Sequence, residues 1–74
     1  MKKLNKAKIG KLYIIKKVKG NPDTLQFLNN LGIVEEEEIM VMSKVASNII
    51  VNVLDTRYGL DENMAKLIEV ELCE

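Results

Sequence analysis

The fold of this chain depends first on residues 21–32, which read NPDTLQFLNNLG. Asn21 is suited to cap the start of a helix, and Pro22 is favoured at the first helical position. Gly32 is suited to the left-handed conformation in which many helices end. A helix of about ten residues is not stable alone in water, so it must dock on a sheet. Its docking face should consist of the apolar residues Leu25, Phe27, Leu28 and Leu31.

Short strand patterns lie on both sides of this helix. Residues 12–18 precede it and are rich in β-forming side chains. After it, turn signals separate four further strand segments, which are residues 38–43, 49–54, 57–60 and 67–72. Asp61 should cap a single helical turn at residues 62–65. Residues 4–10 read as an extended arm that ends in a turn.

These elements predict a mainly β fold in one domain that spans residues 1–74. We expect a small antiparallel barrel of about five strands, with one short helix and one further helical turn. A closed or nearly closed barrel would also protect the strand edges. In the segment 49–54, Asn52 interrupts one face, so the inward residues should be Ile49, Val51 and Val53.

The composition offers few groups for catalysis. The chain of 74 residues has no histidine, and its one cysteine, Cys73, lies next to the last residue. Ser43 and Ser47 flank a turn without a neighbouring base, and no phosphate-binding or dinucleotide glycine motif occurs. We therefore expect no enzymatic activity, no catalytic residue and no bound cofactor.

The formal net charge is zero, but the charges are divided along the chain. The first 20 residues contain eight lysines and no acidic residue, whereas the remainder contains three basic residues and all eleven acidic ones. Such a division can mark a binding face for phosphates, and nucleic-acid binding through the basic N-terminal segment is the alternative function. The other interpretation is a solvated face, partly neutralised by nearby acidic strands. The scarcity of aromatic residues for base stacking and the neutral overall charge argue against nucleic acid as a partner.

A run of four glutamates at residues 35–38 offers hard oxygen ligands for a metal ion. Consecutive residues in a turn or strand point in different directions, and the chain has no histidine to complete a site. We expect no specific metal site there, although weak association with divalent cations is compatible with the sequence.

The sequence shows neither a signal peptide nor a membrane-spanning stretch. No uninterrupted apolar run exceeds four residues, the length of the run at 39–42, which is far shorter than the roughly 20 residues that cross a bilayer. With one unpaired cysteine and no export signal, the sequence favours a cytoplasmic protein that is not inserted in the membrane.

The pattern resembles the FeoA family, the small proteins associated with bacterial ferrous iron uptake. The family typically has a Leu-rich arm, an Ile/Val strand, a short Leu-x-x-Leu-Gly helix and a series of β segments. The matching parts here are Leu4, Gly10 and residues 14–18, 28–33, 39–42, 49–53, 57–60 and 61–70.

This resemblance implies an SH3-like barrel without enzymatic activity. It implies a cytosolic accessory or regulatory protein that contacts the membrane ferrous iron transporter FeoB, which carries a cytosolic GTPase domain. The domain is also similar to the C-terminal module of metal-dependent repressors of the diphtheria toxin repressor type. No helix-turn-helix pattern accompanies it in this sequence, so a repressor role does not follow.

We expect the partner to contact the helix and its surroundings. The family usually has Arg-rich residues in the helix, whereas this sequence has polar, uncharged ones. The predicted contact residues are Lys16, Lys17, Thr24, Gln26, Asn29 and Asn30. They form a rim without a large apolar residue, so binding should be modest and sensitive to salt. Weak self-association is also compatible with the sequence.

Overall fold

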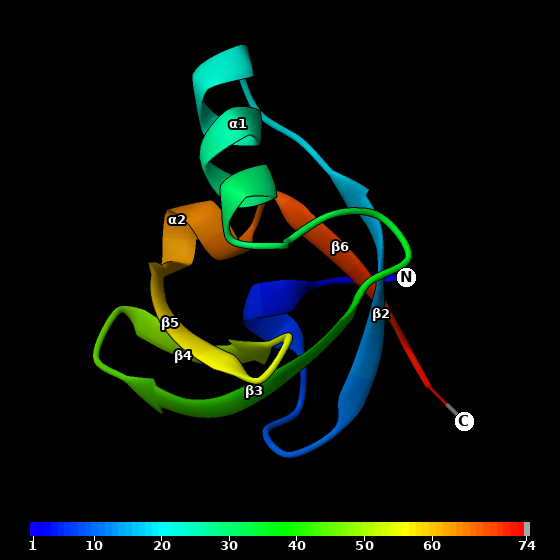
Figure 1. Cartoon of the computed structure of the whole chain (residues 1–74). Helices are drawn as coiled ribbons and strands as arrows, with labels where there is room; N and C mark the ends of the chain where they lie inside the picture. The colour runs from blue at the N-terminus through cyan, green and yellow to red at the C-terminus, as the bar shows by residue number, and fades with distance from the viewer. Residues whose placement is uncertain (74) are drawn as a thin grey trace.

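The computed structural model describes residues 1–73 as one curved antiparallel sheet with two α-helices and a short 3-10 helix (Figure 1). The elements in chain order are β1 (Lys2–Lys3), η1 (Leu4–Lys6), β2 (Leu12–Val18), α1 (Pro22–Asn30), β3 (Glu38–Val45), β4 (Asn48–Val53), β5 (Thr56–Asp61), α2 (Glu62–Ala65) and β6 (Ile68–Leu72). The predicted mainly β fold, with one short helix and a further helical turn, is therefore confirmed.

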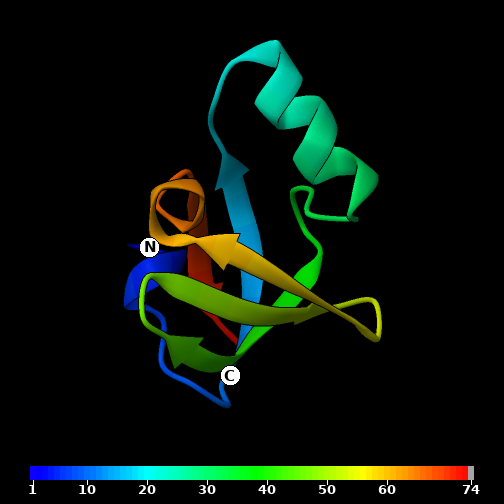
Figure 2. The same cartoon turned by 90° about the vertical axis from the view of Figure 1, so that its left-hand side faces the viewer.

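The sheet has six strands in the order β1-β6-β2-β3-β4-β5, and every neighbouring pair is antiparallel. The sheet thus has six strands where about five were expected, and within residues 1–73 its first and last strands, β1 and β5, do not pair with each other, so the barrel is not closed. Figure 2 shows how the sheet curls around its interior instead of lying flat. Register shifts between Ile15 and Lys17 and between Val41 and Ser43 mark bulges, which increase the local bend and twist.

The core lies inside this curl and follows the alternation of the strands. Tyr13 and Ile15 of β2 are buried, and the neighbouring Leu12 and Ile14 are more exposed. In β4, the predicted inward positions Ile49, Val51 and Val53 are all buried. The period of two thus predicted the correct inner face of β4.

The N-terminal segment differs from the extended arm that the sequence suggested. Residues Leu4–Lys6 form a 3-10 helix, because both Leu4 and Ala7 are buried in the core. Burying two side chains three residues apart requires the chain to turn, since an extended segment would point them to opposite sides. Lys44 Nζ donates a hydrogen bond to the backbone oxygen of Asn5 at 3.2 Å and so ties this turn to the end of β3.

Both ends of α1 are capped as predicted. Asn21 Oδ1 accepts a hydrogen bond from the Thr24 amide at 2.8 Å. At the other end Gly32 has φ of 88°. The Gly32 amide donates to Asn29 O at 3.0 Å and the Ile33 amide donates to Leu28 O at 2.9 Å, the two bonds of a Schellman motif.

The predicted apolar face of α1 is only partly correct. Leu28 is fully buried and Leu31 is half-buried, whereas Leu25 is 38% exposed and Phe27 is 49% exposed. Figure 1 shows the cause, because α1 lies at one end of the curled sheet and is not laid flat along it. A helix docked in this way buries one narrow line of residues and leaves the flanking apolar side chains accessible.

Candidate functional site: an apolar groove beside α1

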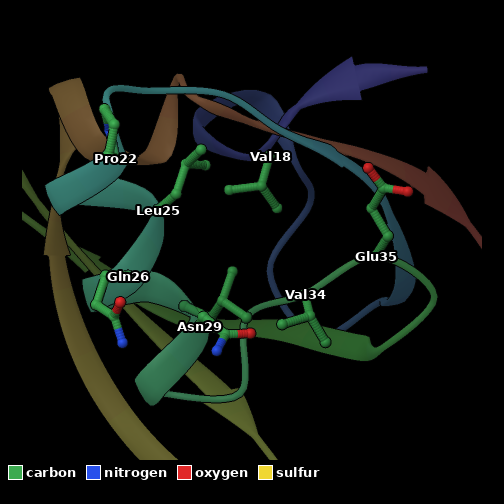
Figure 3. A pocket seen from close by; sticks show the side chains of 8 residues that line it. Val18, Pro22, Leu25, Gln26, Asn29, Val34 and Glu35 are labelled. Atoms are coloured by element: carbon green, nitrogen blue, oxygen red, sulfur yellow. The ribbon is translucent and has the colours of Figure 1, made fainter.

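A groove of about 480 Å³ lies between α1, the end of β2 and the segment that follows the helix. Figure 3 shows this groove and the side chains around it. Its lining residues come from three separate parts of the sequence: Val18, Pro22, Leu25, Gln26, Asn29, Ile33, Val34 and Glu35.

Two glycines with positive φ shape the groove. Gly20, with φ of 139°, turns the chain from β2 into α1, and a Cβ atom there would lie 3.0 Å from Thr24 Cγ2. Gly32 ends the helix and directs Ile33 and Val34 back along it. The groove therefore depends on backbone conformations that glycine adopts at low cost.

The interior of the groove is apolar and its margin is polar. In Figure 3 the side chains of Val18 and Leu25 point toward each other, and Val34 lies across the groove from them, between Asn29 and Glu35. Gln26 and Asn29 place amide groups along the helix side, and Glu35 lies on the opposite side. This combination suits an apolar side chain of a binding partner, with nearby amides to orient the partner's backbone.

The residues predicted from the sequence as a partner-binding rim are not all at this groove. Gln26 and Asn29 line it, and Asn30 lies next to them with Oδ1 3.5 Å from Gln26 Nε2. Thr24 is half-buried, and its methyl group lies against Gly20. The two lysines lie on β2: Lys16 pairs with Glu36 at 3.3 Å, and Lys17 is exposed opposite Glu69 of β6.

Sequence reasoning did not identify the apolar part of the groove. Leu25 was expected to be buried in the docking face of α1, whereas it is partly exposed and lines the groove beside Gln26 and Asn29. One signal was present in the sequence, because Leu25 and Phe27 cannot both lie on the narrow line occupied by Leu28. Val18, Ile33 and Val34 could not be assigned, because only the packed fold brings them beside the helix.

The basic N-terminal segment is partly neutralised by the neighbouring strand β6. Glu69 Oε2 lies 2.8 Å from Lys19 Nζ, and Lys3 and Lys17 occupy the paired positions on either side of Glu69. The hydrogen bond from Lys19, with the positive charges of Lys19, Lys17 and Lys3, lowers the pKa of the Glu69 carboxyl, and partial burial opposes this only in part. The lysines near β6 therefore have a structural counter-charge.

The acidic run at residues 35–38 does not converge on one point. Glu36 faces Lys16, and Glu37 Oε2 accepts a hydrogen bond from the amide of Glu38 at 3.2 Å. Within residues 1–73 no three acidic or cysteine side chains are grouped so that they could hold a metal ion. The helices in this part of the chain are also too short or too polar to cross a bilayer.

Comparison with known proteins identifies relatives of this fold. The FeoA domain family matches residues 2–72 of the chain, whereas no curated protein matches it in sequence. The solved structure of FeoA from Chlorobium tepidum is 24% identical, with a TM-score of 0.90, and the match covers 97% of this chain and 70% of that one.

Two further structures show the same architecture. FeoA from Stenotrophomonas maltophilia, solved in complex with zinc, is 23% identical with a TM-score of 0.84, and the match covers 96% of this chain and 91% of that one. That protein is described as a prokaryotic SH3 domain protein, which confirms the SH3-like fold expected here. A manganese-dependent transcriptional repressor is 19% identical with a TM-score of 0.89, and the match covers 97% of this chain but 41% of the repressor.

Proposed function

The chain belongs to the FeoA family, and from this premise we propose that it is an accessory protein of ferrous iron uptake. It acts in the cytoplasm by contact with the cytosolic part of a FeoB-like transporter. The S. maltophilia relative is described as a candidate activating factor for ferrous iron transport, which supports the assignment to this process. The structural observation that supports a binding role is the apolar groove beside α1.

The groove favours a short protein segment that inserts one apolar side chain. Leu25, Val18 and Val34 provide the apolar contact, and the amides of Gln26 and Asn29 can hydrogen-bond the backbone of that segment. Burying an aliphatic side chain contributes about 1.5–3 kcal/mol, which is large relative to a modest total affinity. We propose that Thr24, Asn30, Lys16 and Lys17 lie at the periphery of this contact.

In this proposed role the chain performs no chemistry of its own. Catalysis by a nucleophile requires a neighbouring base, and Ser43 and Ser47 lie around the exposed β3–β4 turn of a chain that has no histidine. The proposed action is therefore regulation by binding, without a resident cofactor. Weak association of divalent cations with the carboxylates of residues 35–38 is compatible with this role.

A titration of the fluorescently labelled protein with the isolated GTPase domain of the transporter tests the proposal. Leu25→Asp should weaken binding by about tenfold or more, because 1.4 kcal/mol corresponds to a factor of ten in Kd. Phe27→Asp is the matched control, since Phe27 is on the same helix and more exposed, but does not line the groove. Equal losses for both variants would contradict the groove as the contact.

A second measurement separates this function from the nucleic-acid alternative. Binding to a structured RNA with a steep dependence on salt, combined with no binding to the GTPase domain, would overturn the proposal. Charge reversal at Lys16 and Lys17 should weaken the contact only moderately, because Lys16 is already engaged by Glu36.

A further inference from the structure

Strand β5 is an open edge of the sheet. It pairs with β4 along its whole length, from Val53 opposite Thr56 to Asn48 opposite Asp61. Among residues 1–73 no strand lies on its other side, because β5 is the last strand in the sheet order. Figure 2 shows β5 running across the near face of the molecule from the β4–β5 turn to α2, with α1 above it.

The register identifies which backbone groups of β5 point away from β4. The two-residue turn Leu54-Asp55 makes Val53 and Thr56 the first hydrogen-bonded pair, and such pairs then alternate along the hairpin. The amide of Glu62 donates to Ser47 O at 2.9 Å, which continues the same alternation at the far end. It follows that the amide and carbonyl groups of Arg57 and Gly59 point outward from the edge.

These outward groups are accessible. Arg57, Gly59 and Asp61 are all exposed, and for Gly59 this exposure is that of the backbone itself, since glycine has no side chain. A Cβ atom at Gly59 would have only Ile50 Cδ1 within 4 Å, at 3.4 Å. None of the backbone hydrogen bonds that link other elements in residues 1–73 ends on Arg57 or Gly59. The edge is therefore ready to accept another strand.

The sequence of β5 is complementary to itself in one antiparallel register. When two copies of the strand pair about Gly59, Arg57 of each copy lies opposite Asp61 of the other, and Tyr58 lies opposite Leu60. Residues directly opposite on paired strands share a face, with Cβ atoms about 4.5–5.5 Å apart, so both ion pairs can form. Pairing about Arg57 instead would place like charges opposite each other, which is unfavourable.

We propose that two copies of this chain associate through their β5 edges, antiparallel and centred on Gly59, to form a continuous sheet across a two-fold axis. The two ion pairs between Arg57 and Asp61 select this register, and the absence of a side chain at Gly59 leaves the axis free. The same edge is used by both copies, so the assembly closes at two and does not extend into a fibre. Each copy contributes only one six-residue strand, so the dimer is weak and reversible.

Sedimentation equilibrium of the intact chain, from micromolar concentrations to about 1 mM, measures this association in the range expected for weak contacts. Arg57→Asp alone and Asp61→Arg alone should each weaken the dimer by tenfold or more, because each places like charges opposite each other. An equimolar mixture of the two variants should dimerise again, since every Asp then faces an Arg of the other variant. This recovery should diminish at high salt.

Recovery of association in the mixture also shows that each variant alone loses association through its charge and not through misfolding. Asp61 caps α2, with Oδ1 2.7 Å from the Met64 amide, so Asp61→Arg is checked for a native circular dichroism spectrum before mixing. Lys11→Asp, a charge reversal at an exposed residue just before β2, is the control and should dimerise like the parent chain. A parent chain that stays monomeric at about 1 mM would overturn the proposal. A mixture that recovers no association would overturn it as well.

Discussion

Replacement of Gly32 by alanine perturbs the end of α1 in two ways that the structure separates. Gly32 has φ of 88°, a conformation that costs a residue with a Cβ atom about 1–2 kcal/mol. In addition, the new Cβ atom would lie 2.7 Å from Leu54 Cδ1. Leu54 is 63% exposed at the tip of the β4–β5 turn, so it can move aside at a cost of about 0.5–1 kcal/mol in rotamer energy. We expect Gly32→Ala to destabilise the fold by about 2 kcal/mol in total, and Gly32→Val by more.

Gly10→Ala is the matched control for this experiment. Gly10 has nearly the same φ, 82°, but a Cβ atom there would meet nothing within 4 Å. The loss of stability in Gly10→Ala therefore measures the cost of the backbone conformation alone. The difference in stability between Gly32→Ala and Gly10→Ala measures the contact with Leu54. Both are obtained from urea unfolding followed by circular dichroism, with the midpoint and the slope compared. A Gly32→Ala variant as stable as the parent would refute the argument, and equal losses for both variants would remove the steric part.

Three further outcomes follow from the caps, the core and Glu69. Asn21→Ala should cost about 1 kcal/mol through loss of the cap on Thr24, measured by the same urea titration, and no change in midpoint would mean that the cap is dispensable. Leu28→Ala should cost about 2–5 kcal/mol because Leu28 is fully buried, whereas Leu25→Ala at the groove should cost much less; similar losses in thermal melts would contradict the observed docking of α1. Because the pKa of Glu69 is below its ordinary value of 4.5, its contribution to stability is present above that pH and is lost as the pH falls through the lowered pKa. Glu69→Gln should therefore reduce stability at neutral pH and not in strong acid, and a loss independent of pH would contradict the ion pair with Lys19.

Local chemistry determined the parts of the fold that the sequence predicted well. Asn21, Gly32 and Asp61 occupy the capping positions expected for them, because a cap depends on only a few neighbouring residues. The alternation in β4 was equally informative, because Asn52 marks the outer face and the inner face must be apolar.

Long-range packing determined the parts that the sequence did not predict. Leu25 has an apolar side chain of the kind found in protein cores, and only the position of α1 at the end of the sheet leaves it exposed. The segment expected to be an extended arm contains a 3-10 helix, because Leu4 and Ala7 are both buried in the core. The groove is lined by Val18, which precedes the helix, together with residues on the helix and after it, so no local pattern could reveal it.

The position of β6 between β1 and β2 has a consequence for how the chain folds during synthesis. Strand β6 follows the other five strands in the sequence and yet fills an interior place in the sheet, where it pairs with β1 on one side and with residues 13–18 on the other. Translation proceeds at about 5–20 residues per second, so one edge of β2 stays unpaired for several seconds before β6 is synthesised. Native topology is thus available only after translation of β6, and the nascent chain must remain soluble until then with one edge of β2 unpaired. The lysines of that open strand, Lys16 and Lys17, are the kind of charged residue that keeps such an edge from joining other chains.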